Sequence, residues 1–414
     1  MADKPIRVGV VGVSRGMGFA QGAAHVGMEL VAICDTWEER LREAGKTLGV
    51  ATYAEYDRFL EHDMDAVILA NYFHEHAPFA VKALDAGFHV MSECAACHTL
   101  AEGVALARAV ERSGKVYLFA ENYPYMLHNQ EMRRLYHEGA IGQFRYGEGE
   151  YIHPFDARGQ AALAPGMNHW RNWIPATYYC THALGPIMFI TDTRPVKVNG
   201  FIVPYDFDDP HMRRTVRKMD ILGILICRMD NGAVAKAMQF HLRGHGIYTR
   251  IHGNRGLMEN CRTSEWNKLL LRKEPFDTPD GKPVHELYVP DFPEHAAEAN
   301  KAGHGGGDFF TSYHFAEAIR TGTQPYLDVY RGIDMSIAGI LAYRSALNDS
   351  AAVEVPDFRK EEARKRYEDD DWSPDPARRK AGQPFSSILG DIPIADEAIA
   401  LAREVWKEMG YTGA

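Results

Sequence analysis

Five side chains in the first half of the chain are of types that transfer protons near neutral pH. They are Glu121, Tyr151, His153, Tyr179 and His182. Histidine, glutamate and tyrosine are the common general acids and bases of enzymes, and histidine has the ordinary pKa closest to neutrality. A lone tyrosine or histidine is more often structural, so the prediction that these five are catalytic depends on the fold bringing them together.

A glycine-rich segment near the N-terminus has the composition of a dinucleotide-binding turn. Gly9, Gly12, Gly16 and Gly18 surround the end of an apolar run at 6–13. Glycines allow a tight turn and let backbone N–H groups approach a pyrophosphate at a helix N-terminus. Although the strict G-x-G-x-x-G spacing is not met, we expect this turn to bind NAD through Gly12, Ser14, Arg15, Gly16 and Met17.

An acidic residue follows the second apolar run, 23 residues after Gly12. This residue, Asp35, could accept hydrogen bonds from both ribose hydroxyls and would repel a 2′-phosphate, which favours NAD over NADP. The further cofactor contacts that we expect are Asn71, His76, Glu93 and Asn122.

The elements that must position these residues can be read from the apolar pattern. Short apolar runs alternate with helical segments over the first 120 residues, and Thr36 with Glu39 and Thr99 with Glu102 have the spacing of capping boxes. Strands alternating with helices predict a doubly wound parallel sheet, and therefore an α/β Rossmann domain over residues 1–125.

The pattern changes beyond residue 125 to longer runs with alternating polarity. The runs at 219–229 and 234–242 flank Asp230, Asn231 and Gly232, a strong hairpin signal. We expect a second, α+β domain with an open mixed or antiparallel sheet over 126–350. Residues 351–414, with a last helix at 397–409, are expected to pack on these domains or on a neighbouring subunit.

Composition excludes several classes of protein. The 414 residues carry a net charge of −10, which disfavours nucleic acid and anionic membranes as partners. No run of about 18 apolar residues predicts a membrane span, and the N-terminus lacks the pattern of a signal peptide. Six cysteines in a chain of this size predict reduced thiols, so we expect a cytoplasmic enzyme.

Two further motifs point to other chemistries and are rejected. Residues 12–16 match a G-x-S-x-G elbow and 304–307 an HGGG oxyanion loop, but in serine hydrolases the loop precedes the elbow. Residues 94–98 match C-x-x-C-H, yet haem attachment requires export and a zinc site requires a second ligand pair. We expect no metal, and buried or half-buried thiols beside the cofactor.

Taken in order, three motifs resemble the glucose-fructose oxidoreductase, inositol dehydrogenase and MocA superfamily. They are the glycine turn, Ala70-Asn71-Tyr72-Phe73-His74-Glu75-His76, and Gly87-Phe88-His89-Val90-Met91-Ser92-Glu93. The resemblance extends over roughly residues 5–345. It implies a Rossmann domain followed by an open mixed sheet, with a sugar bound between the nicotinamide and that sheet.

The chain departs from the superfamily's dehydrogenases at their proton-transfer groups. Their Glu-Lys-Pro motif is Glu93-Cys94-Ala95 here, and the Asp and His of their second domain are Thr181 and Gly185. The replacements resemble the NAD-dependent α-N-acetylgalactosaminidase branch. The motifs shared with that branch are Ala120-Glu121-Asn122, Tyr151-Ile152-His153, Trp170-Arg171, Tyr179-Cys180-Thr181-His182-Ala183-Leu184-Gly185-Pro186 and the Gly-His-Gly-Gly-x-Asp of 303–308.

This branch implies a redox-neutral hydrolysis of a glycoside. Sugar C3 is oxidised, a base removes the acidified C2 proton, the C1 group is expelled, water adds, and C3 is reduced again. Tyr179 would be the C2 base, while His182 and Glu121 would transfer protons at the C3 hydroxyl or the leaving group. Trp170 and Arg171 would hold the sugar.

Two other functions remain open from the sequence. The first is a net NAD-dependent sugar or polyol dehydrogenase, with His182 or Tyr179 in place of the missing lysine. The second is a non-catalytic sensor of NAD and sugar. An open sheet face and the superfamily resemblance also favour a homo-oligomer.

Overall fold

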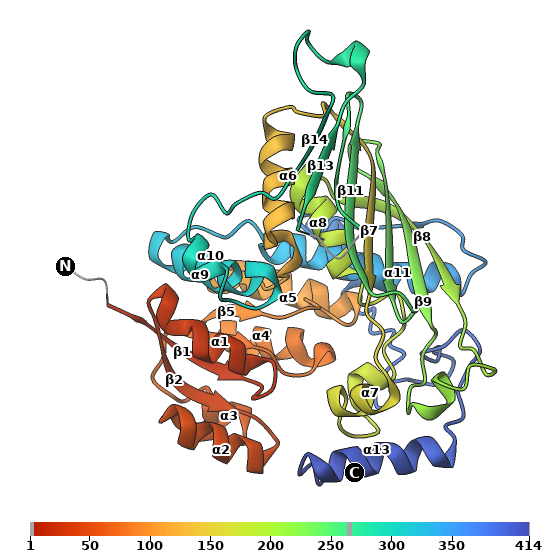
Figure 1. Cartoon of the computed structure of the whole chain (residues 1–414). Helices are drawn as coiled ribbons and strands as arrows, with labels where there is room; N and C mark the ends of the chain where they lie inside the picture. The colour runs from red at the N-terminus through yellow and green to blue at the C-terminus, as the bar shows by residue number, and fades with distance from the viewer. Residues whose placement is uncertain (1–3, 263–266, 414) are drawn as a thin grey trace. The chain divides into compact units, whose positions relative to one another are not determined.

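The chain forms two compact units that interleave along the sequence. Residues 4–262 and 267–413 are described by the structure, a computed structural model (Figure 1). The first unit contains the chain up to Glu131, with Asp291–Asp334 and Asp357–Asp370, and the second contains the remainder. The sequence boundaries at 125 and 350 treat each domain as one continuous segment, whereas in the structure the chain returns twice to the first unit.

The first unit is built on a six-stranded sheet with the order β3-β2-β1-β4-β5-β6. Every pair is parallel, which confirms the predicted doubly wound Rossmann sheet. Its strands are β1 (Ile6–Val11), β2 (Met28–Cys34), β3 (Ala51–Tyr53), β4 (Ala66–Leu69), β5 (His89–Ser92) and β6 (Tyr117–Phe119). Its helices are α1 (Gly16–Gly22), α2 (Glu38–Leu48), α3 (Tyr56–Phe59), α4 (His76–Asp85), α5 (Leu100–Ser113), α9 (Ala296–Ala299), α10 (Gly307–Thr321) and α12 (Glu361–Tyr367).

One of the two predicted capping boxes is confirmed. At α5 the Thr99 side chain accepts a hydrogen bond from the Glu102 N–H while Glu102 bonds back to the Thr99 N–H. At α2 the prediction was wrong, because the helix starts at Glu38 and Trp37 has no side-chain cap. The Asp35 carboxylate instead accepts the Trp37 N–H at 2.8 Å.

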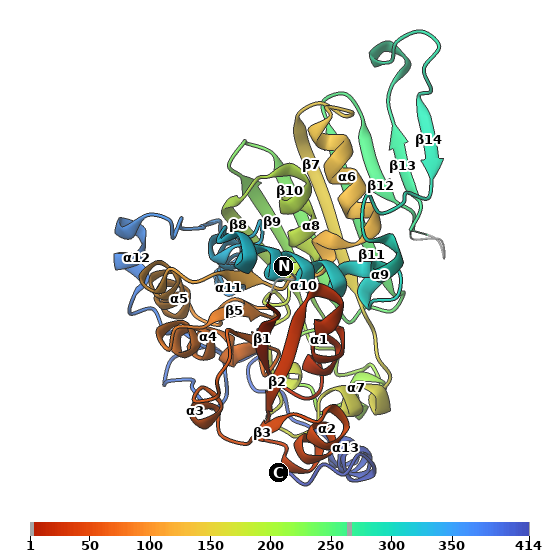
Figure 2. The same cartoon turned by 90° about the vertical axis from the view of Figure 1, so that its left-hand side faces the viewer.

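The second unit contains a nine-stranded mixed sheet with the order β14-β13-β12-β11-β7-β10-β9-β8-β15. Only β7 and β10 pair in parallel, and the predicted Asp230–Gly232 hairpin joins antiparallel β9 and β10. Strands β13 and β14 form the sheet's edge hairpin (Figure 2). The strands are β7 (Phe144–Ile152), β8 (Pro195–Val203), β9 (Leu222–Met229), β10 (Val234–Phe240), β11 (Gly246–Gly253), β12 (Leu257–Asn260), β13 (Leu269–Arg272), β14 (His285–Tyr288) and β15 (Val353–Glu354).

Helix α8 (Thr181–Thr191) lies on one face of this sheet, and all of its residues are buried. The contact is close because β7 carries Gly149, where a Cβ would lie 1.8 Å from the Ala183 carbonyl oxygen. Only a residue without a side chain lets the helix approach β7 this closely, so Gly149 fixes the depth of the first turn of α8.

The predicted C-terminal helix is confirmed as α13 (Asp396–Glu408), and it packs against α7 (Ala157–Leu163) in the same unit (Figures 1 and 2). Trp406 is buried there and donates its indole N–H to the Ala161 carbonyl at 2.9 Å. Helices α6 (Leu127–His137) and α11 (Val329–Ala346) each cross a unit boundary along the chain. Among the described residues no helix has the length and apolar character needed to cross a membrane.

Candidate active site

The turn after β1 has the backbone geometry of a cofactor-binding turn. Gly12 has a φ of +97°, and a Cβ at this position would lie 2.3 Å from the Ala70 carbonyl oxygen at the end of β4. Only glycine fits both constraints. The turn opens α1 at Gly16, and two of its N–H groups are held within the fold: Gly12 donates to the Cys34 carbonyl at 2.8 Å and Val13 donates to Asp35.

Asp35 is fixed at the end of β2 by two backbone groups. Its Oδ2 accepts the Val13 N–H at 2.7 Å and its Oδ1 accepts the Trp37 N–H. The carboxylate therefore lies beside the glycine turn, where an adenosine ribose is held in dinucleotide-binding folds.

The ten predicted cofactor residues all lie at one edge of the first sheet, because the carboxyl ends of parallel strands face the same way. Gly12, Ser14, Arg15, Gly16 and Met17 follow β1, and Asp35, Asn71, His76, Glu93 and Asn122 follow the neighbouring strands. Gly12, which the close turn requires, and Asp35, which lies beside that turn, are both placed as an NAD-binding site requires.

Arg15 belongs to an ionic network whose centre is Asp308, a residue that was not among the predicted site residues. Asp308, in the first turn of α10, accepts two hydrogen bonds from Arg15 at 2.6 and 2.9 Å and one from Asn122 at 2.7 Å. Arg15 also bonds Glu93 at 2.6 Å. Burial opposes the charged form of Asp308, but hydrogen bonds from His304 and Arg15 outweigh it and hold the pKa of Asp308 well below its usual range. The 303–308 motif was the available signal for Asp308.

Glu121 is fully buried in the first unit. Its Oε1 accepts the Tyr123 N–H at 3.2 Å, and its Oε2 accepts a hydrogen bond from the Cys94 thiol at 3.3 Å. Cys94 stands where the resemblance places the dehydrogenase lysine. The Cys97 thiol is buried as well, and burial raises its pKa well above the usual range.

The other four predicted catalytic residues come together in the second unit. His182, in the first turn of α8, shares a 3.2 Å hydrogen bond between its Nε2 and the Tyr179 hydroxyl. The ring of Tyr151, from β7, lies 4.8 Å from that of His182 and 5.6 Å from that of Tyr179. His153, two residues beyond Tyr151, lies 5.6 Å from it.

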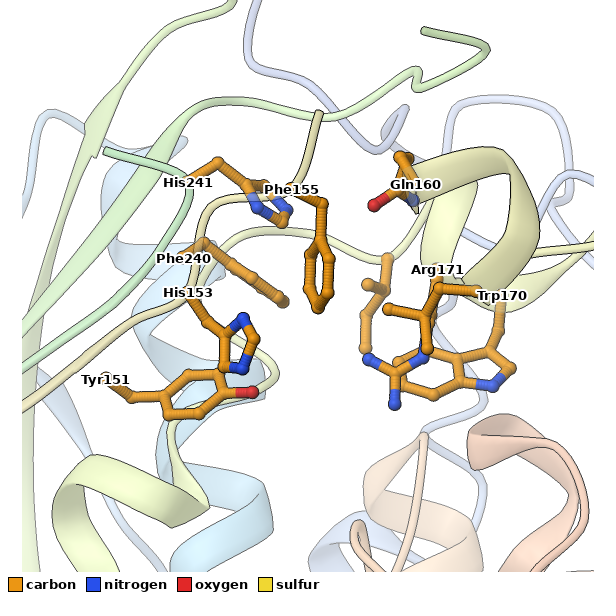
Figure 3. A pocket seen from close by; sticks show the side chains of 10 residues that line it. Tyr151, His153, Phe155, Gln160, Trp170, Arg171, Phe240 and His241 are labelled. Carbon is orange, nitrogen blue, oxygen red and sulfur yellow. The ribbon is translucent and has the colours of Figure 1, made fainter. Parts of the chain in front are cut away.

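A small pocket, open to solvent, adjoins this cluster (Figure 3). Its walls come from the ends of β7 and β10, from α7, and from the turn that carries Trp170 and Arg171. The Tyr179 ring packs against four lining residues, among them Phe240 at 5.4 Å and Trp170 at 5.7 Å. The lining residues are Tyr151, His153, Phe155, Gln160, Leu163, Trp170, Arg171, Ile174, Phe240 and His241.

Trp170 and Arg171, the predicted sugar-binding residues, lie side by side in this pocket. The Arg171 guanidinium is 4.2 Å from the Trp170 ring centre and 5.5 Å from that of Tyr179. Partial burial, together with the charges of His245 and Arg171, lowers the pKa of His153 to about 4, so His153 is neutral at pH 7. Gln160, Phe155, Phe240 and His241 had no sequence signal.

Two family models match separate parts of the chain. Residues 6–121 match the "Oxidoreductase family, NAD-binding Rossmann fold", and residues 205–365 match "Glycosyl hydrolase 109, C-terminal domain". A glycosyl hydrolase family 109 protein of Solibacter usitatus is 26% identical over 399 residues, covering 85% of this chain and 88% of that protein. An α-N-acetylgalactosaminidase of Shewanella oneidensis is 25% identical and covers 85% of each chain.

Solved structures share the fold at low sequence identity. Levoglucosan dehydrogenase, in complex with NADH and L-sorbose, has a TM-score of 0.72 and 19% identity, covering 85% of this chain and 99% of its own. Myo-inositol 2-dehydrogenase from Lactobacillus plantarum has a TM-score of 0.63 and covers 85% of this chain and 100% of its own. The predicted NAD-binding Rossmann domain, followed by a mixed-sheet domain, is confirmed.

Proposed function

We propose that this chain, which joins an NAD-binding Rossmann domain of the oxidoreductase family to a glycosyl hydrolase 109 C-terminal domain, is an NAD-dependent glycosidase with a redox-neutral reaction. The observation that carries the proposal is the buried Tyr179–His182 hydrogen bond, packed against a pocket that contains Trp170 and Arg171. The relatives named as glycosyl hydrolases and as an α-N-acetylgalactosaminidase support the same reaction class.

The cofactor and the protein divide the chemistry. When bound, NAD⁺ supplies reversible hydride acceptance at sugar C3. The remaining steps need a base at C2, proton transfer at the C3 hydroxyl, and a proton for the group that leaves C1.

Tyr179 is the proposed base at C2. A C3 ketone acidifies the C2 proton because the resulting anion is delocalised onto oxygen. A phenol with an ordinary pKa of about 10 is a weak base at neutral pH. The 3.2 Å bond to His182 provides an acceptor for the phenolic proton, so that the Tyr179 oxygen can in turn take the C2 proton.

Glu121 and His182 are the proposed groups for proton transfer at the C3 hydroxyl or the leaving group. Glu121 is oriented by hydrogen bonds from Cys94 and Tyr123. His153 is uncharged at neutral pH, and with Tyr151 it provides hydrogen-bonding groups on the pocket wall.

The experiment that tests this function is a panel of α- and β-nitrophenyl glycosides, with N-acetylgalactosaminides included. The proposal predicts nitrophenol release with no build-up of the reduced-nicotinamide absorbance. Stoichiometric reduced nicotinamide without nitrophenol would instead establish the sugar dehydrogenase, and NAD and sugar binding without turnover would establish the sensor.

Two variants assign the base. Tyr179→Phe should lower turnover by roughly 10²- to 10⁴-fold and leave NAD binding unchanged. Tyr178→Phe is the matched control, because Tyr178 is an adjacent buried tyrosine that packs on Tyr343, whereas the Tyr179 ring packs on residues that line the pocket. Near-normal turnover in Tyr179→Phe would reject the assigned role.

A homo-oligomer in the cytoplasm is the proposed setting. One face of the nine-stranded sheet carries partly buried polar side chains, among them Glu148, Glu150 and Lys236, which suit a contact with a second copy. Light scattering after gel filtration would give the oligomeric state, and a monomer mass would reject it. All six cysteines lie among the described residues, and no disulfide joins them, which supports a reducing compartment. Fractionation of the host cells tests the proposed location.

A further inference from the structure

The pocket beside Tyr179 is basic. Its charge comes from Arg171, because burial lowers the pKa values of His153 and His241 and keeps both uncharged, and none of its ten described lining residues is acidic (Figure 3). No carboxylate of a described residue forms an ion pair with Arg171, whose guanidinium lies on the Trp170 ring at 4.2 Å. The pocket therefore presents a positive charge that the described part of the chain does not neutralise.

A second arginine lies behind the pocket wall. Arg217 is 2% exposed, and its guanidinium donates a hydrogen bond to the Oε1 of Gln160, whose side chain lines the pocket. The Nε of Arg217 is buried and has no hydrogen-bond partner among the described residues. Burial, reinforced by the charge of Arg171, lowers the pKa of Arg217 to about 9, so Arg217 remains charged at neutral pH.

Two neighbouring cations without a carboxylate partner are unfavourable when no anion is bound. A buried cation is normally paired with a carboxylate, since its desolvation is otherwise uncompensated, and here a second like charge lies nearby. The Gln160 side chain accepts a hydrogen bond from Arg217 and donates one to Asn172 at 3.5 Å. Because an amide is uncharged, Gln160 adds no negative charge beside Arg217. An anion in the pocket would supply the missing compensation.

We propose that the pocket binds the oxyanion of an acidic glycoside, with Arg171 contacting the anion and Arg217 adding a second, buried positive charge. The inference rests on the proposed function in one respect, namely that the ligand is a sugar. A carboxylate on a hexuronic acid and a sulfate ester on a hexose carry the same monoanionic oxygens, and the test separates them.

The test measures the affinity of the NAD-loaded chain for sugars by calorimetry. The probes are galacturonate and glucuronate, galactose 6-sulfate, and the neutral galactose and glucose. We expect at least one acid to bind roughly tenfold or more tightly than the neutral sugar of the same configuration. The carboxylate and sulfate arms identify which oxyanion fits, and equal affinities for acidic and neutral sugars would overturn the proposal.

Two substitutions separate anion binding from a structural role. Arg217→Met removes the buried charge at similar volume, so the ligand-free variant should melt no lower than the wild type while its preference for the acid falls severalfold. Arg214→Gln, an exposed arginine on the same segment, is the charge-matched control and should keep the preference. An Arg217→Met protein that melts lower and keeps the full preference would show that Arg217 is structural.

Failure of this inference is distinguishable from failure of the proposed function. Neutral nitrophenyl glycosides that are cleaved with no preference for acidic ones would reject the acidic substrate and leave the glycosidase. Acid-selective binding with no cleavage of any glycoside would reject the glycosidase and leave the anion site.

Discussion

Replacing Asp308 by alanine should destabilise the first unit, because this carboxylate holds three side chains. It accepts two hydrogen bonds from Arg15, one from Asn122 and one from His304, at distances between 2.6 and 2.9 Å. The Asp308 side chain is only 16% exposed, so water cannot fully replace these partners. Asp308→Ala would leave the Arg15 guanidinium with Glu93 alone.

The expected loss follows from these contacts. Removing one partner of a buried ion pair costs about 3–5 kcal/mol. Arg15 is 32% exposed and keeps Glu93, so solvent and that second carboxylate recover part of the loss. We expect the free energy of unfolding to fall by about 2–3 kcal/mol. The affinity for NAD should fall too, since Arg15 lies on the cofactor turn.

Urea unfolding followed by circular dichroism measures the effect. The control is Asp57→Ala, which removes an ion pair with Lys82 in which the Asp57 side chain is 75% exposed and should change stability by less than about 0.5 kcal/mol. Because the pKa of Asp308 is lowered in the fold, its contribution is present above the unfolded pKa of about 4 and is lost as the pH falls below it. Equal losses in the two variants, or a difference that disappears between pH 5 and 8, would refute the reasoning.

Three further changes have defined outcomes. Asp35→Ser should weaken NAD binding and raise the relative affinity for NADP, measured by calorimetry, because the carboxylate beside Val13 is removed. Trp406→Ala should lower the free energy of unfolding by about 3–5 kcal/mol and raise the KM, since α13 supports the helix that carries Gln160. His153→Gln should make stability less dependent on pH between 4 and 6.5: the folded pKa of about 4 lies below the unfolded value, so in the wild type stability is lost as the pH falls through this window. An unchanged NAD preference, KM or pH slope would contradict the respective argument.

Local sequence patterns predicted the Rossmann unit closely, because its elements follow one another along the chain. Each buried strand shows as an apolar run, and Thr99 with Glu102 forms the capping box that its spacing implies. The return of 291–334 to the first unit left no such pattern, since it depends on contacts between distant segments. Strand β14 had no apolar pattern to predict it, because it is mostly exposed and lacks a buried face.

The candidate site was predictable where the chemistry lies in short motifs. Tyr179 and His182 are three residues apart around the start of α8, so their 3.2 Å contact follows from local geometry. Asp308 was present in a recognised motif, yet only the fold shows that it meets Arg15. Arg217 lies in a basic stretch of sequence with Arg213, Arg214 and Lys218, a pattern typical of a solvated surface, whereas the fold buries it. Burial of a single charged residue depends on the whole unit and has no local signal.

The most direct test of the central claim is the hydrolysis of a reactive nitrophenyl glycoside in D₂O, with the sugar product analysed by nuclear magnetic resonance. The account predicts one deuterium at C2 of the product, because Tyr179 removes that proton and solvent replaces it while C3 is transiently a ketone. Product released with protium retained at C2 would contradict the account and indicate direct displacement at C1.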